Sequence, residues 1–166
     1  MKKISILTGT VLMLLLTQCG PTTEQARQYN DKLIAEELKV MDKINAVDNA
    51  FATYKPDIIE PAVDEALKQI DLSEEVVKNI GDFAEDSEFK NETLNLFEMF
   101  KKQLKSEYSE QLELYKLSDE EYTTNEENRY NELQRKIDDE YTKVFNKFSK
   151  TQDNFAAKWG FPLEGQ

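Results

Sequence analysis

The sequence has no histidine and only one cysteine, Cys19, among its 166 residues. Without an imidazole there is no histidine base, no catalytic triad that uses histidine, and no Glu-x-x-His pair for a di-iron site in a helical bundle. Almost all zinc sites are excluded for the same reason. A single cysteine also excludes a disulfide within the chain.

Glycine and proline are scarce too, with five and four residues. Charged residues make up 33% of the chain and hydrophobic residues 39%, a balance that favours long helices over β-sandwiches or barrels. Lys and Arg number 21 against 33 acidic residues, so we predict no nucleic-acid binding, because phosphates are bound chiefly by clustered basic side chains. The net charge of −12 suits solubility and would also suit a basic protein partner.

Motifs of common catalytic and nucleotide sites are missing as well. The sequence has no glycine-rich phosphate loop, no dinucleotide fingerprint and no serine nucleophile elbow. Its many carboxylates have the spacing of solvated helix faces, and nothing selects one pair for catalysis. We therefore predict that the protein is not an enzyme and has no cofactor.

The best candidate for a cation site is the acidic segment 82–88. Asp82, Glu85, Asp86 and Glu88 crowd a predicted loop there, but they lack the spacing and the central glycine of an EF-hand. We therefore predict no dedicated metal site, and weak cation binding by this loop stays an open question.

The first residues have the pattern of a secretory signal peptide. Lys2 and Lys3 precede a mostly apolar run from Ile4 to Leu16. This run is too short to span a membrane as a helix, because about twenty apolar residues are needed to cross the hydrocarbon core. Removal of this segment would leave the mature chain two charges more negative, since both lysines would be lost.

The end of the apolar run, Leu16-Thr17-Gln18-Cys19, resembles the lipobox of bacterial lipoproteins. That family attaches diacylglycerol to the cysteine sulfur and is then cleaved before the cysteine, which later carries fatty acyl chains such as palmitate. Gln18 departs from the Gly, Ala or Ser that the family usually has there. The competing interpretations are an ordinary signal peptide cut elsewhere, an uncleaved anchor, and a cysteine that forms a disulfide with another chain.

The resemblance implies a signal peptide over 1–18, a lipidated tether over 19–23 and a helical domain over 24–166. Two or more acyl chains hold a protein stably on a membrane. Gly20 follows Cys19 where an Asp would be the family's inner-membrane retention signal, so the resemblance favours the outer membrane. The overall plan is similar to that of small helical surface lipoproteins of uncharacterised function in diderm bacteria.

Beyond the tether, apolar residues recur at helical spacing in four segments. The segments run from Thr23 to Phe51, Ile59 to Ile80, Phe89 to Tyr115 and Tyr130 to Trp159. We therefore predict an all-α, antiparallel up-down four-helix bundle. The alternative is three long helices, with the third and fourth segments fused across Leu117.

Several local details remain open at this level. Pro61 fits a helix only in its first turn, and Asp71-Leu72-Ser73 could interrupt the second helix. The last helix has two candidate starts with capping-box spacing, one at Ser118 and one at the adjacent Thr123 and Thr124. We expect Gly160 to end the last helix, with Trp159 and Phe161 packed on the core as its cap. Asn30 and Glu37 are expected at the edge of the first apolar stripe or near the bundle end.

Two functions fit this sequence; we predict the first, without a small-molecule ligand, and the second is the alternative. The first is a membrane-anchored lipoprotein whose non-catalytic domain binds a protein partner or has a structural role at the cell envelope. The second is an envelope carrier or enzyme with a small-ligand cavity between the helices, a role that would need a cavity of about 300 Å³ or more. Only a set of aromatic side chains points to it, and core packing also accounts for them: Phe97, Phe100, Tyr108, Tyr141, Phe145 and Phe148.

Overall fold

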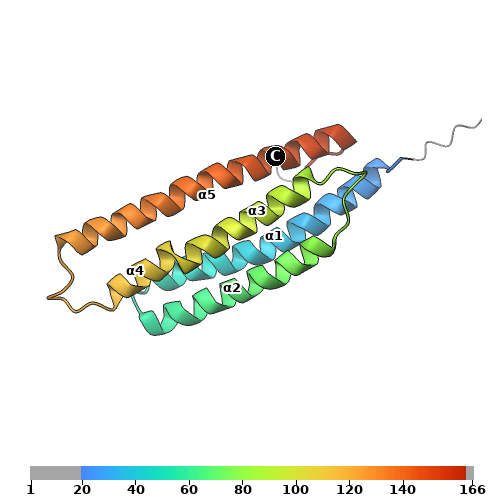
Figure 1. The fold of residues 1–166 in the computed structure, drawn as a ribbon. Coiled ribbons are helices and arrows are strands. Elements are labelled where there is room, and N and C mark those ends of the chain that lie inside the picture. Colours follow the sequence, from blue (N-terminus) through green and yellow to red (C-terminus); the bar gives the residue numbers. More distant parts are fainter. Residues whose placement is uncertain (1–19, 164–166) are drawn as a thin grey trace, which may run out of the picture.

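The computed structural model describes residues 20–163 (Figure 1). Cys19, the predicted lipidation site, and the three residues before it, which resemble a lipobox, lie outside the described residues. Within residues 20–163, no helix has both the length and the apolar content needed to cross a membrane.

In the described part of the chain, five helices form four antiparallel rods, and the predicted bundle is confirmed (Figure 1). The third rod consists of α3 and α4, which are separated only by a bend at Ser106. The fused three-helix alternative is wrong, because residues 116–123 leave the helical path between the third and fourth rods. The helices are α1 Thr23–Phe51, α2 Pro56–Asn79, α3 Glu88–Lys105, α4 Glu107–Tyr115 and α5 Thr124–Trp159.

Local capping explains where the longest helices begin and end. Thr22 and Gln25 form a capping box at the start of α1. Of the two candidate starts for α5, Thr123 is the observed one: its side chain and that of Glu126 satisfy each other's backbone N–H groups. At the other end of α5, Gly160 adopts φ +71°, a left-handed conformation that glycine tolerates best.

α2 differs from the expectations in two respects. Pro61 lies inside the helix, beyond the first turn that begins at Pro56, so the expected restriction to the first turn is wrong. Asp71 to Ser73 continue the helix without a break. Ser73 is buried, and its hydroxyl donates to the Glu36 carboxylate at 2.9 Å, which satisfies both groups between α1 and α2.

An aromatic cluster closes the end of the bundle where the described chain begins. The Phe155 ring lies at its centre, with five neighbouring ring centroids 5.5–6.4 Å away. Phe161 is buried and Trp159 packs edge-on against Phe83 at 4.9 Å, so both belong to this core, as expected for the helix cap. The neighbours of Phe155 are Tyr29, Phe83, Phe89, Trp159 and Phe161.

The fourth rod is not packed equally against its two neighbours. α5 lies along α3 and α4 over most of its length, whereas its contact with α1 is much lighter. At the opposite end of the bundle from the aromatic cluster, the α1–α5 side therefore stays open and forms a groove.

Candidate ligand-binding groove

The groove has a volume of about 450 Å³ and lies between the second half of α1, the α3–α4 rod and the first half of α5. Its walls combine aromatic rings with amide, hydroxyl and carboxylate groups. The lining includes Asn45, Asp48, Phe51, Tyr54, Phe100, Gln103, Tyr108, Gln111, Tyr115, Tyr130, Gln134, Asp138 and Tyr141.

Two glutamines of the α3–α4 rod form the polar floor of the groove. Both are buried, with about 1% of their surface exposed. The Gln103 amide donates to the backbone carbonyl of Ile137 at 3.0 Å, and the Gln111 amide donates to Gln134 at 3.3 Å. Gln134 in turn donates to the Asp138 carboxylate at 3.2 Å. This chain of hydrogen bonds holds the α5 wall in place across the floor.

Asp48 brings a carboxylate into the groove from the α1 wall. It accepts a hydrogen bond of 2.7 Å from the Tyr108 hydroxyl. Desolvation raises the pKa of Asp48; the bond from Tyr108 opposes this shift, and the charge of Asp138 adds to it. Burial and the neighbouring Asp48 carboxylate raise the pKa of Tyr108 far above its usual range, so this phenol stays protonated and remains a donor.

Aromatic rings gather at the end of the groove beside the α1–α2 turn. Tyr115 is their centre: its ring stacks on Tyr130 at 5.4 Å and lies 5.3 Å from Tyr54 and 5.8 Å from Phe51. The Tyr115 hydroxyl donates to that of Tyr130 at 2.8 Å. Tyr54 has φ +56°, a left-handed conformation that is uncommon for a bulky residue, and it remains 71% exposed at the rim.

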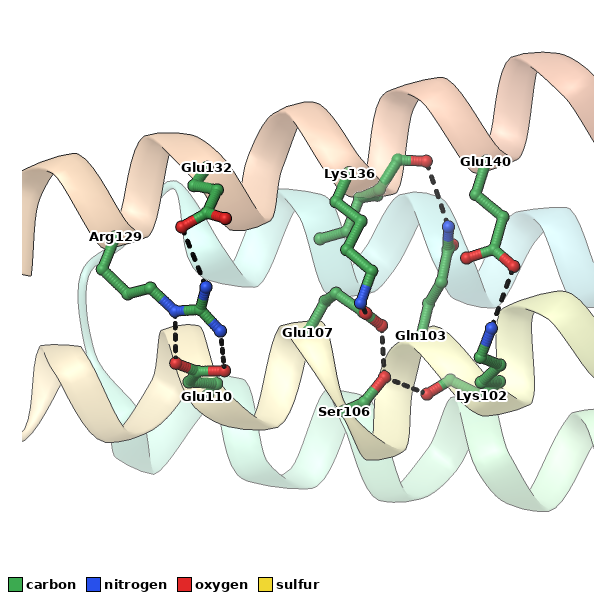
Figure 2. A network of polar contacts seen from close by, with 10 residues as sticks. Lys102, Gln103, Ser106, Glu107, Glu110, Arg129, Glu132, Lys136 and Glu140 are labelled. Carbon is green, nitrogen blue, oxygen red and sulfur yellow. Dashed lines mark hydrogen bonds and ion pairs between the residues drawn. The ribbon is translucent and has the colours of Figure 1, made fainter.

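Outside the groove, a network of ion pairs fastens α5 to the α3–α4 rod (Figure 2). The Arg129 guanidinium of α5 donates a hydrogen bond to each carboxylate oxygen of Glu110, at 2.6 and 2.8 Å. Lys102 donates to Glu140 at 3.1 Å. This network holds the basic side chains of the region away from the groove, and none of them lines it.

The centre of the network is a carboxylate at the bend between α3 and α4. Glu107 is buried and is contacted by Lys136 and by the Ser106 hydroxyl (Figure 2). Burial alone would raise the pKa of Glu107, but these two partners hold it below its usual value. Glu107 is therefore ionised at neutral pH, and its charge is neutralised by Lys136.

The charged residues that line the groove are Asp48 and Asp138, and both are acidic. Comparisons with known families, curated proteins and solved structures found no match to this chain.

Two carboxylates of the acidic segment 82–88 are paired with lysines. Lys90 pairs with Asp82, and Lys158 lies 2.6 Å from Asp86, whose pKa it lowers. No group of three or more carboxylates or thiols placed to hold a metal ion occurs within residues 20–163.

The six aromatic residues that suggested a cavity divide into two groups. Phe100, Tyr108 and Tyr141 line the groove. Phe97 and Phe148 are buried in the core, as packing alone explains. Phe145 is half-buried and stacks on Tyr141 at 5.3 Å, next to the groove.

Several polar members of the groove were not found from the sequence. Gln103 and Gln111 interrupt the third apolar stripe at core positions, and such polar residues on a buried face are a usable signal. Asp48 carried no such signal, because it lies beside the apolar stripe of α1. Whether it lines a groove depends on where α5 packs against α1.

Glu37 is a buried carboxylate one turn of α1 away from the groove. Only 7% of its surface is exposed, so the expected position at the stripe edge or bundle end is wrong. Burial raises the pKa of Glu37 to about 7. Asn30, also buried, does lie near the bundle end, where it accepts a hydrogen bond from Gln152 at 3.0 Å.

Proposed function

We propose that this protein is a lipoprotein of the bacterial cell envelope, held by lipid on Cys19, whose helical domain binds a small molecule without catalysis. The observation that carries the second half of this proposal is the groove of about 450 Å³. Small-molecule sites generally have volumes of about 300–1,000 Å³ and combine apolar walls with a few placed polar groups. The groove therefore favours the binding function over a purely structural one.

The position of the groove fits a protein tethered at its N-terminus. The groove residues of α1 lie between Met41 and Phe51, whereas the helix begins at Thr23. At 1.5 Å per residue, the groove begins about 27 Å along the helix from its first residue. A domain anchored through Cys19 on the outer membrane would thus present the groove well away from the lipid surface.

Replacing Cys19 with alanine tests the anchor. In a bacterium with the lipoprotein pathway, we expect the wild type to lose residues 1–18, gain the mass of its acyl chains and partition into the detergent phase. The Cys19→Ala variant should show neither the acyl mass nor the partitioning. Intact mass and detergent partitioning measure both properties. A wild type that is soluble and unacylated would overturn the anchor.

Filling the groove tests the binding function. Asn45 is exposed and lines the groove, whereas Asn49 is exposed on α1 one turn further and does not line it. We expect at least one compound from a panel of neutral, cationic and anionic small molecules to raise the melting temperature of the wild type. Asn49→Trp should keep this response and Asn45→Trp should lose it. An equal response from both variants, or no response from the wild type, would contradict binding in the groove.

A further inference from the structure

We propose that the ligand of the groove is a small organic cation that carries an ammonium group. This inference rests on the proposed binding function and adds the chemical class of the ligand. It follows from the charge of the lining residues, the clustered aromatic rings and the volume of the groove. Each of these three features excludes or favours different classes of ligand.

The negative charge of the lining disfavours an anionic ligand. Asp48 projects from α1 and Asp138 belongs to α5, so the two carboxylates come from opposite walls. Their charges are close enough for Asp138 to raise the pKa of Asp48. Neither forms an ion pair within residues 20–163, and no lysine or arginine lines the groove. A cation placed between these walls is attracted by both carboxylates, whereas an anion is repelled by both.

Two basic residues of α5 that follow or precede groove residues in the sequence are ion-paired outside the groove. Arg129 is held by Glu110 and Glu132, and Lys136 by the buried Glu107 (Figure 2). Within residues 20–163 no basic side chain lines the groove beside Asp48 and Asp138, so their charge is left for a ligand.

The rings add a second preference for a cation. Phe51, Tyr54, Tyr115 and Tyr130 form one aromatic cluster at the end of the groove, with neighbouring centroids 5.3–5.8 Å apart. The negative faces of aromatic rings attract ammonium groups, and aromatic side chains are common in sites that bind quaternary ammonium ligands. Tyr54 leaves most of its surface exposed at the rim, where an entering ligand can contact it.

The volume separates an organic cation from a metal ion. A space of about 450 Å³ is far larger than a bare ion, and a calcium ion would need six to eight oxygen ligands within about 2.6 Å. The lining offers two carboxylates on opposite walls in a space that also contains apolar rings. These surroundings suit a molecule with both a charged head and carbon atoms.

Two pairs of probes of matched size test this inference. Choline is compared with its neutral isostere 3,3-dimethylbutan-1-ol, and putrescine with butane-1,4-diol, by calorimetric titration of the mature lipidated protein in dodecyl maltoside. We expect at least one cation to bind at least tenfold more tightly than its neutral match. Asp48→Asn should weaken the binding of that cation at least tenfold, and the exposed Asp42→Asn of α1, which does not line the groove, should leave it unchanged.

A loss of binding must be distinguished from a loss of the folded structure. Asn at position 48 keeps an oxygen that can accept from Tyr108, and circular dichroism checks that the helices persist. If Asp48→Asn does not fold, Asp138→Asn, which changes the other wall, takes its place with the same expected result. Unchanged cation binding in the folded variant would overturn the inference.

The outcomes separate this inference from the binding function itself. The neutral compounds could bind as tightly as the cations and lose this binding in the Asn45→Trp variant. That result would overturn the inference that the ligand is a cation, but the proposed binding function would stand. If none of the four probes binds, this inference fails, whereas the binding function fails only if the wider panel also leaves the melting temperature of the wild type unchanged. Binding of tetralysine but of neither small amine would also overturn the inference, in favour of a basic protein partner.

Discussion

Replacing Phe155 with alanine should lower the free energy of unfolding by about 3–5 kcal/mol, the usual cost of removing a buried aromatic ring. Phe155 is buried at the centre of the aromatic cluster and contacts rings from α1, the 80–87 loop, α3 and the segment after α5. No single neighbour can fill the space, because each of these rings is held by a different element. Chemical denaturation followed by circular dichroism measures the change.

Phe145→Ala is the matched control on the same helix. Its ring is half-buried and contacts Tyr141 and Phe148, so its removal opens less enclosed space and should cost clearly less. Equal losses for the two variants would mean that the end of the bundle beside the tether does not pack as described.

Glu37→Gln should stabilise the protein by roughly 3 kcal/mol above pH 7 and have little effect below pH 4.5. Burial raises the pKa of Glu37 from 4.5 to about 7 in the folded state. Between these values the folded chain holds a proton that the unfolded chain has released, so stability falls as pH rises. Above pH 7 both states are ionised, and the folded state bears the full cost of a buried charge, which the amide avoids.

The measurement is the free energy of unfolding of wild type and variant at pH values from 4 to 8. Glu75→Gln, at an exposed position of α2, is the control and should leave the pH profile of the wild type unchanged. A difference between wild type and Glu37→Gln that stays constant over this range would show that Glu37 does not titrate in the predicted window.

Periodicity and capping chemistry were sufficient to predict the four rods. The regular spacing from Tyr130 to Trp159 and the Gly160 stop correspond closely to α5, because both depend on residues near in sequence. The bend at Ser106 was not predicted, since the apolar stripe passes through it without a change of phase. Its buried neighbour Glu107 has a partner on α5, a contact that no local pattern contains.

The groove could be anticipated only in part. Aromatic residues on the inner faces were visible as a pattern, but whether a ring fills the core or lines a cavity depends on how closely two distant helices approach. Asp48 and Asp138 are 90 residues apart in sequence and face one space only because α5 packs lightly on α1. That asymmetry results from the sum of many side-chain contacts along the α3–α5 side.

The distance of the groove from the first residue of α1 has a consequence for what the site can sense. Electrostatic potentials in physiological salt decay over a Debye length of about 8 Å, and the groove begins about 27 Å along α1. For a domain anchored through Cys19, the headgroup charges of the membrane would contribute almost nothing at Asp48 and Asp138. The groove would then respond to the free concentration of its ligand in the surrounding solution, independently of the lipid composition beneath it.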